Sequence, residues 1–174
     1  MIAIQGKKLV DTETGEILSP DISPRFSNLK YGDYVKAFPH IRHITPMKAE
    51  ATTAKEAPTK KTFGEQKFDG FRGLAYFTKE GIRMFTYNIS KDTGWFGEYT
   101  DNVPHIRDLI FDYPDLVGTV LDVEFVMPTG LFKDVSGVAG SKTLVDTAIN
   151  NQIEKGLGQL KCFDILYYKG MRIS

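Results

Sequence analysis

The sequence contains little cysteine and little histidine, and it has no excess of charge of either sign. Cys162 is the only cysteine, so an internal disulfide and a zinc site built from several thiols are both excluded. The three histidines show no metal-ligand spacing with one another. Lysine plus arginine and aspartate plus glutamate number 22 each, so no overall basic field indicates a nucleic-acid partner.

Long apolar runs are missing as well. No stretch reaches the length that a bilayer span requires. Met1 is not followed by the basic and then apolar segments of a secretory signal. We therefore expect a soluble, cytoplasmic protein that has no membrane partner.

The composition that remains is that of an ordinary globular domain. The chain has 174 residues, of which 41% are hydrophobic and 25% are charged, enough for one core without disulfides or metals. Residues 1–43 are typical of an N-terminal hairpin and loop extension, because strand-like segments at 7–10 and 16–18 flank a turn at 11–15. Residues 44–174 then form the main domain.

The strand signals of the main domain come mostly in hairpins. Residues 71–77 and 82–87 are separated by a turn at 78–81, and further strands are expected at 119–126 and 160–168. Hairpins, rather than regular alternation of strands and helices, predict an α+β fold with largely antiparallel sheets and flanking helices.

Two helices are expected beside these strands. Apolar residues at helical spacing predict helices over 103–111 and 144–155, the second capped by Thr143 and ended by Gly156. The glycine-rich segment 137–143 lacks the spacing of a phosphate-binding P-loop. We expect it to be a loop that leads into the second helix.

Charged side chains crowd into residues 65–72, between two strand-like segments. Lys67 becomes a nucleophile if its amine is deprotonated. Gly70 permits close approach of a ligand, and the forked guanidinium of Arg72 suits phosphate. The alternative is an exposed hairpin whose charges are simply solvated.

Two carboxylates share one face of the segment 119–126. Period-two alternation places Asp122 and Glu124 beside two valines, and burial of both acids requires a cation or hydrogen-bond donors. This arrangement suits a metal site or a site for ribose hydroxyls. It is equally compatible with a strand that has one solvated face.

The segment 160–168 carries an aromatic candidate. Alternation predicts that Phe163 shares a face with Lys161, Ile165 and Tyr167. Phe163 then either stacks on a nucleotide base or is an ordinary core residue.

Taken in order, these segments resemble the motifs of the covalent nucleotidyltransferases, which include ATP-dependent DNA ligases, RNA ligases and mRNA capping enzymes. Residues 67–72 match the Lys-x-Asp-Gly-x-Arg motif. Residues 122–124 resemble the Asp-Gly-Glu strand, and residues 163–167 resemble the Phe-Asp-apolar-Leu-Tyr strand. Upstream, Thr45-Pro46-Met47 is similar to the Pro-Met that opens the adenylation domain of ATP-dependent DNA ligases. The resemblance covers about residues 44–174.

The resemblance implies an ATP-grasp-like nucleotidyltransferase (adenylation) domain that uses ATP and Mg²⁺ and seals nicked double-stranded DNA. Lys67 would attack the α-phosphate of ATP, expel pyrophosphate and hold AMP, which then passes to a 5′-phosphate before a 3′-hydroxyl displaces it. Glu65 would contact the adenine, and Phe163 would stack on it. Arg72 would hold the ribose or the 5′-phosphate of the nick, and Glu124 would bind magnesium or the ribose.

The sequence departs from the family pattern in several places. Val123 stands where the second motif has glycine, and residues 86–88 lack the arginine of the family's Ser-Arg pair. The family's later motifs and its oligonucleotide-binding domain have no counterpart before Ser174. We therefore expect an adenylation domain that is incomplete at its C-terminus. The chain is then a fragment, a truncated relative, or one half of a split gene in which a second chain supplies the missing motifs.

Two other functions stay open at this point. One is an RNA ligase or an mRNA capping-type nucleotidyltransferase, since these enzymes share the lysine motif. The other is a truncated, inactive module that binds a nucleotide or DNA.

Overall fold

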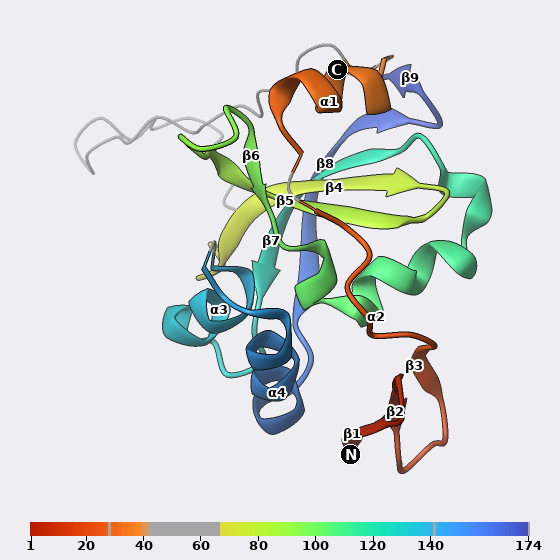
Figure 1. Cartoon of the computed structure of the whole chain (residues 1–174), viewed down its shortest axis with the longest axis vertical. Coiled ribbons are helices and arrows are strands. Elements are labelled where there is room, and N and C mark those ends of the chain that lie inside the picture. The colour runs from red at the N-terminus through yellow and green to blue at the C-terminus, as the bar shows by residue number, and fades with distance from the viewer. Residues whose placement is uncertain (28, 40, 42–66, 141, 174) are drawn as a thin grey trace, which may run out of the picture.

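A curled six-stranded sheet with helices on both faces forms the centre of the molecule (Figure 1). The computed structural model describes residues 1–27, 29–39, 41, 67–140 and 142–173. Within these residues, no helix has both the length and the apolar character to cross a membrane. The predicted α+β class is confirmed.

The six-stranded sheet is antiparallel throughout, in the order β6-β5-β4-β7-β8-β9. Its strands are β4 (Phe71–Thr78), β5 (Gly81–Ile89), β6 (Phe96–Glu98), β7 (Val120–Val126), β8 (Gln159–Tyr168) and β9 (Met171–Arg172). Alternation along the two central strands sends Ala75 and Val123 to one core and Tyr76 and Val120 to the other. The predicted hairpin and both predicted strands are confirmed.

The first core lies between the sheet and three helices. These are α2 (Pro104–Arg107), α3 (Phe132–Ala139) and α4 (Val145–Lys155), with 3₁₀ turns at Thr100–Asn102, Asp108–Phe111 and Pro114–Leu116. Met84, Val123 and Phe125 of the sheet meet Ile106 and Val135 of the helices there, all essentially buried. The helix expected over 103–111 is therefore a short α-helix continued by a 3₁₀ turn.

The second core lies on the opposite face, under α1 (Tyr31–Ala37) (Figure 1). Seven residues are too few for a helix to be stable on its own, and Tyr34 holds this one in place. The Tyr34 ring is buried and stacks on Trp95 at 3.8 Å between ring centroids. Its hydroxyl donates to the Ile41 carbonyl (3.0 Å) and lies 3.1 Å from the Tyr76 hydroxyl.

A separate three-stranded antiparallel sheet precedes these elements, made of β1 (Ile2–Gln5), β2 (Lys8–Asp11) and β3 (Ile17–Ser19). The hairpin predicted at 7–18 is confirmed as β2 and β3. Strand β1 was not predicted. It pairs with β2 across a turn at residues 6–7, where Gly6 has a φ of 63°.

Four charged side chains connect the N-terminal segment to α2. They are the buried Asp101, Arg107 and Asp108 and the more exposed Arg25, and we call them the arginine clasp. Arg107 is fully buried and donates to Asp101 (2.8 Å) and Asp108 (2.9 Å). The Asp101 carboxylate also accepts the backbone N–H groups of Arg25 and Phe26, and Arg25 pairs with Asp108.

Two local predictions around α4 are wrong. Helix α4 ends at Gly156 as expected, with φ of 95° there. Thr143 does not cap its start, however, because the Thr143 hydroxyl donates to the Ser136 carbonyl instead (3.1 Å). The segment 137–143 is not a loop throughout, because its first residues complete α3, whose Val135 and Val138 are fully buried.

Strand β8 contains two bulges, which overturn the predicted common face of Lys161, Phe163, Ile165 and Tyr167. Its partners on β7 skip Phe163 and Leu166, and each extra residue reverses the alternation. Lys161 consequently opposes Glu124 whereas Ile165 opposes Leu121, on the other face of the sheet.

Candidate functional site

The pairing of β4 with β7 brings the first two candidate motifs to the same end of the sheet. Arg72 lies directly opposite Glu124 in the register of the two strands. Two residues before Arg72, the Gly70 N–H donates to the Glu124 carboxylate (3.1 Å). The Lys-x-Asp-Gly-x-Arg segment is thereby joined to the carboxylate strand by a side-chain contact as well as by the backbone ladder.

Gly70 is required at this junction because no side chain fits there. A Cβ atom on Gly70 would lie 2.2 Å from the Phe125 carbonyl oxygen and 2.8 Å from the Glu124 side chain. The close contact at this glycine is with the neighbouring strand, and the approach of a ligand stays a prediction.

Arg72 forms a two-pronged ion pair with Asp122. Its Nε donates to Oδ1 (3.0 Å) and its Nη2 donates to Oδ2 (2.6 Å). This bonding raises the pKa of Arg72, and the guanidinium also lies 5.5 Å from the centre of the Tyr87 ring. The Asp122 side chain is only 4% exposed, and a buried carboxylate requires a counter-charge, which Arg72 supplies. The guanidinium plane is thus held rigidly at the sheet surface.

Glu124 sits half-buried beside this pair. Burial raises its pKa, whereas the Gly70 N–H and the nearby charge of Arg72 act in the opposite direction. A carboxyl group of this kind can change its ionisation when a cation or a sugar hydroxyl approaches. The face shared by Asp122 and Glu124 is confirmed, and it is partly buried rather than fully solvated.

Lys67 and Asp69 are exposed just before β4, with half-buried Phe68 between them. The Lys67 side chain therefore begins three residues from the contact between Gly70 and Glu124. Glu65 and the segment Thr45-Pro46-Met47 lie outside the described residues, so their predicted roles stay predictions.

Phe163 is the extra residue of the first bulge in β8, next to the position that opposes Asp122. Its ring is 43% exposed, and it belongs to neither buried core, so the core alternative for Phe163 is not what the structure shows. The bulge presents an aromatic ring at the sheet surface, one strand away from the two carboxylates.

Lys161 is the residue that sequence reasoning missed. It lies opposite Glu124, so that Arg72, Glu124 and Lys161 form a row across β4, β7 and β8, which we call the charged row. The Lys161 ammonium lies 5.7 Å from the centre of the Phe68 ring. The residue of β8 that lies opposite Glu124 can be identified only when the position of the bulge is known. The sequence does not show that position, so it could not identify Lys161.

A protein-only metal cage is not present in the part of the chain that the structure describes. No group of three or more His, Cys, Asp or Glu side chains converges there. Asp122 is bonded to Arg72, whereas Glu124 is a carboxylate of this face that could meet a cation. Magnesium commonly binds through one or two carboxylates together with substrate phosphates, so a metal that arrives with its nucleotide is compatible with these residues.

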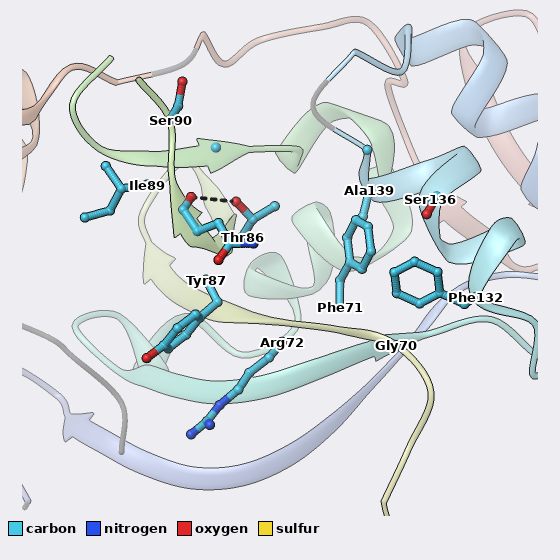
Figure 2. Close-up of a pocket in the computed structure, with 13 residues that line it drawn as sticks. Gly70, Phe71, Arg72, Thr86, Tyr87, Ile89, Ser90, Phe132, Ser136 and Ala139 are labelled. Atoms are coloured by element: carbon cyan, nitrogen blue, oxygen red, sulfur yellow. Dashed lines mark hydrogen bonds between the residues drawn. The ribbon is translucent and has the colours of Figure 1, made fainter. Parts of the chain in front are cut away.

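A cavity of about 640 Å³ opens at this end of the sheet, between the ends of β4 and β5, strand β6 and helix α3 (Figure 2). Phe71 and Phe132 form an aromatic pair on its α3 side, with ring centroids 5.1 Å apart. Figure 2 shows the Arg72 and Tyr87 side chains directed away from these two rings. Arg72 is the one charged residue among the described residues that line the cavity, and its guanidinium is directed toward Asp122.

The chain was also compared with known proteins. A scan against protein-family models, a search of curated proteins and a search of solved structures each found no match.

Proposed function

We propose that this chain carries the nucleotide-binding half of a covalent nucleotidyltransferase of the ATP-dependent DNA ligase type, with an ATP-grasp-like adenylation fold. The observation that supports the proposal most strongly is the contact between Gly70 and Glu124 beside the Arg72–Glu124 register. Two motifs that lie far apart in the sequence meet at one sheet end, within three residues of the candidate nucleophile.

The proposed reaction begins at Lys67. Its uncharged amine attacks the α-phosphorus of ATP, a P–N bond forms, and the bond from that phosphorus to the pyrophosphate oxygen breaks. The amine proton passes to solvent, and AMP stays on the lysine. The 5′-phosphate of nicked DNA then accepts AMP and frees Lys67. Finally the 3′-hydroxyl attacks that phosphate and expels AMP.

The other site residues have positioning roles in this proposal. The guanidinium of Arg72, fixed by Asp122, meets the ribose or a phosphate. Phe163 offers its exposed ring to the adenine. Glu124 binds the ribose or, together with phosphate oxygens, Mg²⁺. Bound Mg²⁺ would neutralise phosphate charge and so favour attack by the amine.

Intact-mass measurement after incubation with ATP and magnesium tests the proposal. We expect the chain to gain one AMP through an acid-stable bond, and the Lys67→Ala variant to gain none. Lys79→Ala is the matched control, because Lys79 is an exposed lysine in the turn at the far end of the β4–β5 hairpin. A chain that forms no adduct with ATP or GTP, or a Lys67→Ala variant that still forms one, contradicts the proposal.

The choice of acceptor is tested separately. A chain first loaded with AMP is mixed with nicked duplex DNA or with nicked RNA, each carrying a labelled 5′-phosphate. Transfer of AMP to the DNA supports the ligase proposal. Transfer to RNA alone, or adduct formation with GTP in preference to ATP, would assign the chain to the RNA ligase or capping branch.

A further inference from the structure

The charged row places two cations on either side of one carboxyl group. Arg72, Glu124 and Lys161 are register partners on three neighbouring strands, so their side chains leave the sheet next to one another. The two cations differ in what they contact. Arg72 is paired with Asp122, whereas Lys161 pairs with no carboxylate among the residues that the structure describes.

Within the described part of the chain, the charge on Lys161 is therefore incompletely compensated. Its ammonium donates one hydrogen bond, to the neutral amide oxygen of Gln159 at 3.3 Å. Glu124 lies opposite Lys161, but its carboxylate accepts the Gly70 N–H and forms no ion pair with Lys161. An ammonium group has three donors, so Lys161 retains donor capacity for an anion.

The Lys161 ammonium lies close to the segment that carries the candidate nucleophile, Lys67. Its ammonium lies over the Phe68 ring, 5.7 Å from the ring centre, and Phe68 directly follows Lys67. The half-buried Lys161 stem and the Phe68 ring thus hold a cation beside the segment that carries the reacting amine.

We propose that Lys161 binds phosphate oxygens of the nucleoside triphosphate while Lys67 attacks it. The inference rests on the proposed function and adds a binding residue to it. A triphosphate carries several negative charges, and negative charge builds up on the departing pyrophosphate oxygen as the bond to the α-phosphorus breaks. An ammonium placed beside Phe68, the residue after Lys67, stabilises that charge by hydrogen bonding and needs no covalent change of its own.

Adduct formation is the first measurement. Single-turnover rates are recorded over a range of ATP concentrations for the wild type, Lys161→Ala, Lys161→Arg and the control Lys79→Ala. We expect Lys161→Ala to lower the rate at limiting ATP by about tenfold or more, and Lys161→Arg to recover most of it. Equal rates for Lys161→Ala and the wild type overturn the inference and leave the proposed function in place.

Binding without chemistry separates the two proposals. Calorimetry measures the binding of tripolyphosphate and of adenosine to two proteins, the Lys67→Ala variant and the double variant Lys67→Ala, Lys161→Ala. Circular dichroism checks that both proteins are folded. We expect the alanine to weaken tripolyphosphate binding and to leave adenosine binding unchanged. If the wild type forms no adduct but tripolyphosphate binding still depends on Lys161, the anion site stands and the transferase fails. If binding is independent of Lys161, the inference fails.

Discussion

At the scale of single residues, Gly70 fixes how closely the lysine segment approaches the carboxylate strand. Gly70→Ala would place a methyl group 2.2 Å from the Phe125 carbonyl oxygen, a backbone atom that cannot move by a side-chain rotation. We expect a loss of about 1–3 kcal/mol in the free energy of unfolding. The variant should also lose adduct formation, because the Gly70–Glu124 hydrogen bond must lengthen.

Gly32→Ala is the control for that substitution. Gly32 lies in α1, and a Cβ atom there has no neighbour within 4 Å. Alanine favours a helix over glycine by about 1 kcal/mol, so this variant should be neutral or slightly stabilising in urea denaturation. Equal stability of the Gly70→Ala and wild-type chains would show that β4 and β7 can separate at this end without cost.

At the scale of elements, α2 is docked through a histidine that responds to pH. The Nε2–H of His105 donates to the Gly158 carbonyl (2.9 Å), and its Nδ1 is enclosed without a partner among the described residues. Burial lowers the pKa of His105, although the Gly158 carbonyl and Asp108 oppose this effect. Below the unfolded-state pKa of about 6.5, His105 is therefore protonated more readily in the unfolded chain than in the folded chain.

The sign of the effect follows directly. His105 adds no pH dependence to stability above about pH 6.5, and it lowers stability as the pH falls below that value. We expect the wild type to lose stability relative to His105→Gln between about pH 6.5 and 5, with a slope no greater than about 1.4 kcal/mol per pH unit. Urea unfolding at several pH values measures this, and parallel curves for the two chains would contradict it.

Elements that carry their own local signals were predictable from the sequence. The β4–β5 hairpin has a turn at its centre, and α4 has apolar residues at helical spacing and a glycine at its end. The bulges of β8 were not predictable, since nothing in the local sequence marks Phe163 or Leu166 as extra residues. They arise from pairing with β7, a partner distant in the sequence.

The same limit applies to the candidate site. Lys67, Arg72 and Glu124 were singled out from their motifs, and the register of β4 and β7 brings Arg72 and Glu124 together. The pairing of Arg72 with Asp122 and the place of Lys161 depend on side-chain geometry between strands. Such contacts are fixed by tertiary packing rather than by local pattern.

At the scale of the whole molecule, the arginine clasp holds the N-terminal segment against α2 and the 3₁₀ turns beside it. Replacing Arg107 by alanine would leave the Asp101 and Asp108 carboxylates buried without their main counter-charge. We expect the free energy of unfolding to fall by about 3–5 kcal/mol. Urea denaturation measures the loss, and limited proteolysis should cut the segment between β3 and α1 earlier than in the wild type.

An exposed ion pair provides the matched control. Lys169 contacts Asp115 at 3.1 Å, and the two side chains are 39% and 70% exposed. Lys169→Ala should therefore change stability by no more than about 1 kcal/mol. Similar losses for the Arg107 and Lys169 variants would mean that the clasp is not what attaches the N-terminal segment.

The order of strands in the main sheet also bears on how the chain folds. The β4–β5 hairpin closes over a turn of a few residues, whereas β4 can pair with β7 only after the whole of residues 79–119 has been looped out. Closing a long loop costs entropy before any contact across it forms, and sheets joined by distant pairs fold slowly. The hairpin should therefore form early and the β4–β7 pair late. The two halves of the candidate site would then assemble in the same late step that completes the fold.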